Sequence, residues 1–134
     1  MKTALKLLSG LALLIIAGCF PGPYQAVDVL EKLGEDKIEI KKALLECGML
    51  NPHDDYMMDY RELSINANTS IYACLTQAGF HSKLGWEWKD RCRNYNAEDL
   101  PICVPGAVIP QRSVKKRLNS AYCQKYKNAL ECQP

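Results

Sequence analysis

The chain has 134 residues, the size of one modest domain, and almost half of them are hydrophobic. Its 17 basic and 15 acidic residues nearly cancel, and this balance argues against a protein that binds nucleic acid. Only two tryptophans and two phenylalanines are available for a core, whereas seven cysteines indicate an exported protein whose disulfides supply part of the stability.

The first 18 residues have the pattern of an export signal. Lys2 and Lys6 accompany an apolar stretch over residues 7–16, which is shorter than the roughly 20 residues that a membrane span requires. This stretch runs into Ile16–Ala17–Gly18–Cys19, which resembles the lipobox of bacterial lipoproteins. In that family the cysteine sulfur receives diacylglycerol, a dedicated peptidase removes the signal peptide, and the new amine is acylated, for instance with palmitate. The alternative is an ordinary signal peptide followed by a chance cysteine.

The lipobox resemblance implies a signal peptide at residues 1–18 and a lipid anchor at Cys19. An odd number of cysteines would leave one reactive thiol in an exported protein, and lipidation of Cys19 leaves an even six. Two acyl chains hold a protein stably on a membrane. In enteric lipoproteins an aspartate after the lipidated cysteine retains the protein in the inner membrane. Phe20 stands there in this chain, so the resemblance implies the outer membrane of a Gram-negative envelope and leaves the leaflet open.

We expect residues 19–34 to carry the lipidated cysteine and a tether, and residues 35–134 to form one cysteine-rich domain. The tether begins with Phe20–Pro21–Gly22–Pro23, which is incompatible with helix or sheet. From about Val27 apolar residues recur at helical spacing, but Gly34 interrupts them.

Two longer helices follow. Asp36 as N-cap and Gly48 as a left-handed terminator predict a helix over residues 36–47. The second begins at Asn66 or Asn68 and ends at Ala78, before Gly79, because apolar residues recur there at helical spacing.

The rest of the chain predicts short elements. Residues 86–92 form helix or extended chain, and residues 92–103 form a loop. Ser113 and Ser120 are suitable N-caps for helical turns over residues 114–118 and 121–126. Because no segment alternates as a strand does, we expect an all-α or mostly α, small and irregular single domain stapled by disulfides.

Six cysteines allow 15 pairings, and the sequence cannot choose among them. We favour Cys47–Cys74, Cys92–Cys103 and Cys123–Cys132. The first would join the two longer helices, and the other two would close short loops that are poor in apolar residues. A zinc site is the alternative, but the close cysteine spacing that such sites favour does not occur. We therefore expect neither a metal nor a cofactor.

The sequence contains no recognisable catalytic arrangement, so we expect a protein that is not an enzyme. It has two histidines, no nucleophile elbow and, once the cysteines pair, no free thiol. An acidic stretch could in principle hold a cation, but it lacks the alternating ligands and central glycine of a calcium loop. Its members are His53, Asp54, Asp55, Asp59 and Glu62.

Two features are candidates for binding a partner. Trp86 and Trp88 stand two residues apart, so at most one of them is expected to enter the core fully, and an exposed tryptophan is typical of an interaction surface. Residues 112–127 form a basic segment without acidic residues, and this segment could bind a protein or an anionic envelope partner. The alternative, which we favour, is a basic face directed toward the acidic N-terminal half. The leading candidates for partner binding are Arg112, Lys115, Lys116 and Arg117.

The mature chain also resembles a group of small cysteine-rich lipoproteins of Gram-negative bacteria. The resemblance lies in residues 41–48, in Cys74 with Ala78–Gly79–Phe80, in Pro101–Ile102–Cys103 and in residues 131–134. The group has no assigned activity, so the resemblance implies one stapled domain and no mechanism. We expect an outer-membrane-anchored, non-enzymatic binding module of the immunity, exclusion or inhibitor type. The alternative is a structural or assembly accessory of the envelope.

Overall fold

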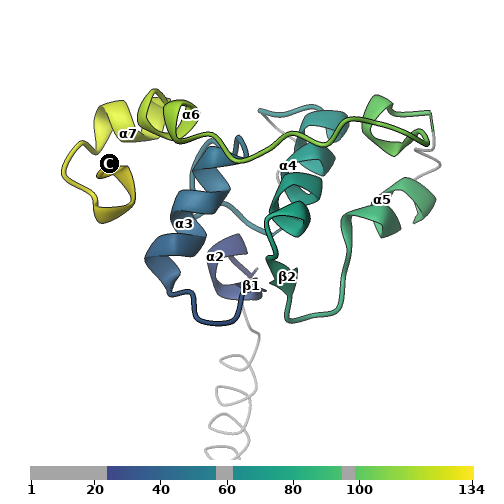
Figure 1. The fold of residues 1–134 in the computed structure, drawn as a ribbon, viewed down its shortest axis with the longest axis horizontal. Helices are drawn as coiled ribbons and strands as arrows, with labels where there is room; N and C mark the ends of the chain where they lie inside the picture. Colours follow the sequence, from purple (N-terminus) through teal and green to yellow (C-terminus); the bar gives the residue numbers. More distant parts are fainter. Residues whose placement is uncertain (1–23, 57–61, 95–98) are drawn as a thin grey trace, which may run out of the picture.

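Helix α3 lies at the centre of the fold and contacts elements from both ends of the chain. The computed structural model describes residues 24–56, 62–94 and 99–134, so the expected signal peptide and Cys19 lie outside the described residues. Figure 1 shows α3 between α4 on one side and α6 with α7 on the other. In chain order the elements are α2 (Ala26–Val29), β1 (Leu30–Glu31), α3 (Lys37–Glu46), α4 (Ile65–Gln77), β2 (His81–Ser82), α5 (Trp88–Asn94), η1 (Pro101–Cys103), α6 (Val114–Leu118), α7 (Ala121–Lys125) and η2 (Leu130–Cys132). The expectation of a mostly helical, irregular domain is confirmed.

The boundaries of α3 follow the predicted caps. The Asp36 side chain accepts a hydrogen bond of 3.0 Å from the Glu39 N–H, which satisfies one donor of the first turn. Gly48 has a φ of +107°, in the region where a side chain would be strained, and ends the helix. One side of α3 contributes Ile40, Ala43 and Leu44 to the main core.

Helix α4 starts earlier than predicted. Its N-cap is Ser64, whose hydroxyl accepts a hydrogen bond from the Ala67 N–H, whereas Asn66 or Asn68 was expected to begin it. Both asparagines lie within the helix, and their side chains accept hydrogen bonds from residues outside it. Asn66 accepts a hydrogen bond from the Ile102 N–H, and the buried Asn68 accepts one from Arg91. These two contacts attach η1 and α5 to α4.

The predicted tether boundary at residue 34 is wrong, because the domain begins earlier. Residues 26–31 form α2 and β1, and Val27 and Leu30 are buried in the main core. β1 pairs antiparallel with β2, with Leu30 opposite Ser82, so a short strand pair exists where none was expected. The helical spacing noted from about Val27 falls in α2, whereas β1, with two residues, is too short to show an alternating pattern. Each is held by contacts with residues far along the chain.

A smaller second core lies on the other side of α3. Leu45 packs there with Cys123 and Cys132, and with the partly buried Tyr122 and Ala129. The segment over residues 104–113 crosses the molecule from η1 to α6 (Figure 1). At the start of α6 the Ser113 N–H donates a hydrogen bond to the Glu46 carbonyl oxygen. Ser113 and Ser120 cap α6 and α7 as predicted.

Three disulfides join the elements in the pairing favoured from the sequence. Cys47–Cys74 links the end of α3 to α4, Cys92–Cys103 links α5 to η1, and Cys123–Cys132 links α7 to η2. The first lies inside the main core, and the other two close short loops. The predicted loop over residues 92–103 thus contains the end of α5 and the turn η1.

Candidate functional site

The basic segment over residues 112–127 divides by residue type into an inward and an outward set. Both arginines turn toward α3. Arg112 lies 2.7 Å from Glu39 and 2.9 Å from Glu46. Nε of Arg117 lies 3.4 Å from the same Glu46 carboxylate, and both of these side chains are almost fully buried. Burial alone would lower the pKa of Arg112, but its hydrogen bonds to Glu46 and Glu39 raise that pKa above the usual value.

Arg117 also holds the C-terminal end of the chain. Its Nη1 donates to the backbone oxygens of Glu131, at 2.8 Å, and of Gln133, at 2.6 Å. A guanidinium suits this position because its several donors have a fixed geometry. Arg112 and Arg117 therefore follow the interpretation favoured from the sequence, a basic face toward the acidic half, and not the alternative that placed them on an exposed partner-binding surface. Their charges face the acidic side chains of α3.

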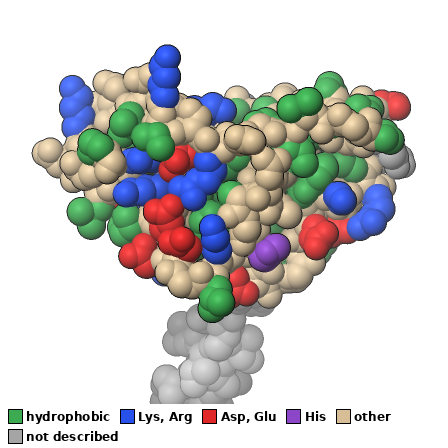
Figure 2. All heavy atoms as spheres, in the orientation of Figure 1, with side chains coloured by type: hydrophobic (Ala, Val, Ile, Leu, Met, Phe, Trp, Pro, Cys, Tyr) green, Lys and Arg blue, Asp and Glu red, His purple; other side chains and the backbone are tan. Residues whose placement is uncertain are grey.

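The lysines of the same segment point outward. Lys115, Lys116, Lys125 and Lys127 are exposed, and none of them forms an ion pair with a carboxylate in the part of the chain that the structure describes. Figure 2 shows basic side chains standing out from the surface over α6 and α7. We call these four residues the lysine face.

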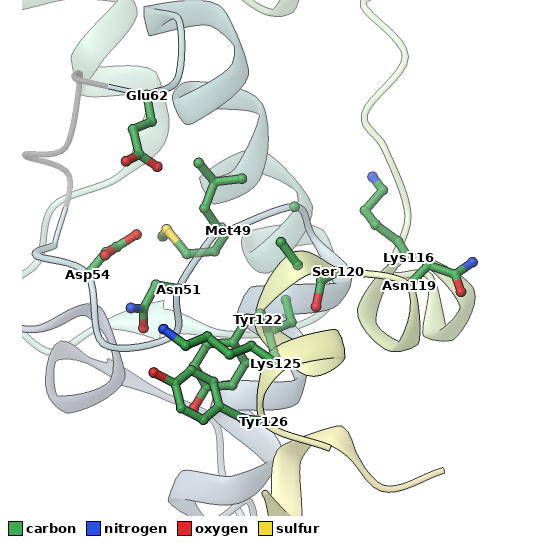
Figure 3. A pocket seen from close by; sticks show the side chains of 14 residues that line it. Met49, Asn51, Asp54, Glu62, Lys116, Asn119, Ser120, Tyr122, Lys125 and Tyr126 are labelled. Atoms are coloured by element: carbon green, nitrogen blue, oxygen red, sulfur yellow. The ribbon is translucent and has the colours of Figure 1, made fainter. Parts of the chain in front are cut away.

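A groove of about 680 Å³ borders the lysine face. One wall is the connection after α3, with Met49, Asn51 and Asp54, together with Glu62. The other wall consists of α6 and α7, with Lys116, Lys125, Tyr122 and Tyr126. Figure 3 shows the two tyrosine rings beside one another, with Lys125 reaching across them toward Asn51. The groove is thus lined by a buried methionine, two aromatic rings and charges of both signs.

The two tyrosines differ in how their side chains are held and how far they are exposed. Burial and a hydrogen bond of 2.7 Å to the Glu131 carboxylate raise the pKa of Tyr122 to about 12, so its hydroxyl stays protonated and engaged. Tyr126 has its ring centroid 4.8 Å from that of Tyr122 and is 47% exposed. The ammonium of Lys125 lies 5.3 Å from the Tyr126 ring. Tyr126 therefore presents an aromatic surface that is already paired with a cation.

The tyrosines were missed by the sequence analysis. Their spacing of four residues places them on one face of α7, and that spacing was the available signal. What the sequence could not show is that the connection after α3 lies opposite this face.

The two tryptophans do not join this site. Trp88 packs against the main core, whereas Trp86 is 56% exposed, so only one of them is partly buried, as expected. Figure 1 places α5 and the connection that precedes it at the end of the molecule away from α6 and α7. The aromatic and basic candidates from the sequence thus belong to two separate surfaces.

No family model, curated protein or solved structure matches this chain. Within residues 24–56, 62–94 and 99–134, no group of three or more histidine, cysteine or acidic side chains is placed to hold a metal ion. In these ranges no helix is long and apolar enough to cross a membrane. Of the acidic stretch, Asp54 and Glu62 line the groove, and Asp59 lies outside the described residues.

Proposed function

We propose that this chain is the precursor of an outer-membrane lipoprotein, anchored through Cys19, that acts as a non-enzymatic binding module. The partner that fits the described surface is an acidic protein. Its carboxylates would pair with the lysine face, and a side chain beside them would pack on Tyr126 in the groove.

The observation that carries this proposal is that no carboxylate of the described residues forms an ion pair with the lysine face. Three of the four ammonium groups belong to the short helices α6 and α7 and the fourth, that of Lys127, to the turn after α7, and the segment that contains them has no acidic residue to neutralise them. The two arginines of the same segment are already neutralised by Glu39 and Glu46. The positive electrostatic potential of the lysines is therefore directed toward solvent. Complementary charge of this kind increases association rates and selects partners. An exposed tyrosine next to it supplies the aromatic contact that is typical of interaction hot spots.

The lipid anchor is tested by the mass of the mature protein. Purified from a bacterial envelope, it should begin at Cys19 and carry acyl chains, and a Cys19→Ala form should leave the membrane fraction. A mature protein that begins elsewhere and carries no lipid would contradict this part of the proposal.

The binding surface is tested by reversing charge on it. We expect Lys115→Glu with Lys116→Glu to weaken capture of acidic envelope proteins. We also expect capture by the unchanged protein to weaken as salt rises, because interactions between exposed charges are screened beyond about 8 Å at physiological ionic strength. Capture is measured with the immobilised protein at several salt concentrations.

The matched control changes the same number of charges away from the lysine face. Lys83 and Lys89 are exposed near α5, so Lys83→Glu with Lys89→Glu should leave capture unchanged. Equal weakening by both pairs would show that only net charge matters. Binding to anionic lipid vesicles with no protein captured would point to a membrane in place of a protein partner. Either result would contradict the proposed surface.

A further inference from the structure

The chain enters the domain at Tyr24, close in sequence to the proposed lipid anchor. Tyr24 is five positions after Cys19, and a fully extended chain spans at most about 3.6 Å per residue, so the Cα atom of Tyr24 can lie no more than about 18 Å from the Cα atom of Cys19. The surface around Tyr24 is therefore held next to the bilayer. This inference rests on the proposed lipid anchor.

An exposed tryptophan lies close to that entry point. The Tyr24 carbonyl oxygen accepts a hydrogen bond of 2.7 Å from the Tyr56 N–H. The Tyr56 hydroxyl in turn donates to the Trp86 carbonyl oxygen at 3.3 Å. Tyr24 and Trp86 are each 56% exposed, so two aromatic side chains flank the point at which the chain arrives.

Two exposed leucines lie at the same end of the molecule. Leu33, between β1 and α3, is fully exposed, and Leu84, in the connection from β2 to α5, is about half exposed. Figure 1 places both connections at the end where the described chain begins. Leu33 and Lys83 line one shallow hollow there, which the pairing of β1 with β2 creates.

We propose that this surface rests in the headgroup region of the bilayer that carries the protein's own lipid anchor. Its apolar members are Tyr24, Leu33, Leu84 and Trp86. Tyrosine and tryptophan concentrate at the membrane interface because an apolar ring and a polar group meet there. Lys83, which is exposed and lines the same hollow as Leu33, can extend its ammonium group toward water or phosphate, whereas the Lys32 ammonium lies 5.3 Å from the Phe80 ring.

The charges at this end predict how the contact depends on lipid type. Glu31, Glu35 and Glu87 accompany the lysines, so the surface is mixed in sign and gains little from anionic lipid. The contact is therefore driven by the apolar side chains and by the short tether. It occurs on zwitterionic phosphatidylcholine and changes little with salt, whereas binding at the lysine face weakens with salt.

The test uses the two tryptophans as probes. The lipidated full-length mature protein is bound to phosphatidylcholine vesicles whose acyl chains carry bromine, which quenches tryptophan fluorescence at short range. With Trp88→Phe the remaining Trp86 should be strongly quenched and its emission should shift to the blue. With Trp86→Phe the remaining Trp88, which packs against the core, should keep its emission. Quenching of Trp86 no greater than that of Trp88 would overturn the proposal.

A second variant guards against a tryptophan substitution that disturbs the fold. Leu33→Ser with Leu84→Ser changes two exposed side chains, so the fold should persist, as checked by circular dichroism. The quenching of Trp86 should be lost although the lipid still holds the protein on the vesicle. Protein that floats with vesicles and shows acyl chains by mass, but has an unquenched Trp86, refutes the membrane-facing surface alone. Protein that carries no lipid and does not float refutes the anchor and the surface together.

Discussion

At the scale of the residue, the difference between arginine and lysine organises the C-terminal segment. A guanidinium offers several donors in one plane and is weakly hydrated, so Arg117 can be buried against Glu46 and two backbone oxygens. An ammonium is strongly hydrated, and Lys115 and Lys116 remain in water. The same basic run therefore contributes both to the interior and to the surface. A count of its charges could not assign these roles.

Glu46 is the residue on which the buried charges depend. It is 4% exposed and faces both Arg112 and Arg117. We expect Glu46→Gln to lower the free energy of unfolding by about 3–5 kcal/mol, because it leaves a buried guanidinium without its counter-charge. Denaturant unfolding of the oxidised protein measures the loss.

Glu39 provides the control for this prediction. It also contacts Arg112, but its side chain is 30% exposed, so Glu39→Gln should cost at most about 1 kcal/mol. If the two variants lost equal stability, the burial of Glu46 would not be the cause.

At the scale of the element, capping residues determined how well the sequence predicted the fold. Each of three residues was predicted as the N-cap of one helix, and each caps that helix in the structure. They are Asp36, Ser113 and Ser120. α4 begins at Ile65, one residue before the earlier of the two expected starts, and its cap Ser64 was not identified from the sequence. The side chains of Asn66 and Asn68 accept hydrogen bonds from η1 and α5, and these contacts are not visible in the sequence. Helical spacing was noted from about Val27, where α2 lies, but β1 was missed for a related reason. Its pairing depends on β2, which is distant in the sequence.

The candidate site could be predicted only in part for the same reason. The basic segment was visible as a run of charges, and Lys115 and Lys116 do lie on the surface. The groove requires Met49 and Asp54 to lie opposite α7, and this depends on how the chain packs around α3. No local pattern in the sequence encodes such an arrangement.

The helices that carry the lysine face depend on their disulfide. α6 and α7 have five residues each, too few for a helix to persist alone in water. Cys123 and Cys132 are nine residues apart, and a loop of this size is worth about 3 kcal/mol. We expect replacement of both by alanine to speed amide hydrogen exchange in α6, α7 and η2 while α4 stays protected. Hydrogen exchange followed by mass spectrometry locates the change.

The disulfide at the other end gives the comparison. Cys92 and Cys103 close a loop of similar length, so their replacement by alanine should speed exchange in α5 and η1 and spare α6 and α7. Faster exchange throughout the domain in both variants would mean that the C-terminal segment does not open as a separate unit.

At the scale of the whole molecule, the short tether and the two surfaces define an orientation. The described chain begins at one end of the molecule, and α6 and α7 lie at the other (Figure 1). With the first end against the bilayer, the lysine face is directed away from the membrane that carries the protein. A partner in the adjoining compartment, or a soluble one, could then reach the lysines without displacing lipid.

Labelling of lysines on vesicles measures this orientation directly. A water-soluble acylating reagent is applied to the lipidated protein on phosphatidylcholine vesicles and, as the control, to the Cys19→Ala protein mixed with the same vesicles. Lys83 should react more slowly in the lipidated protein, because the interface covers it, while Lys115 and Lys127 should react equally in both. Slow labelling of Lys115 and Lys127 with rapid labelling of Lys83 would show the reverse orientation. The lysine face would then be the membrane contact, and the exposed end with Trp86 would be the surface left for a partner.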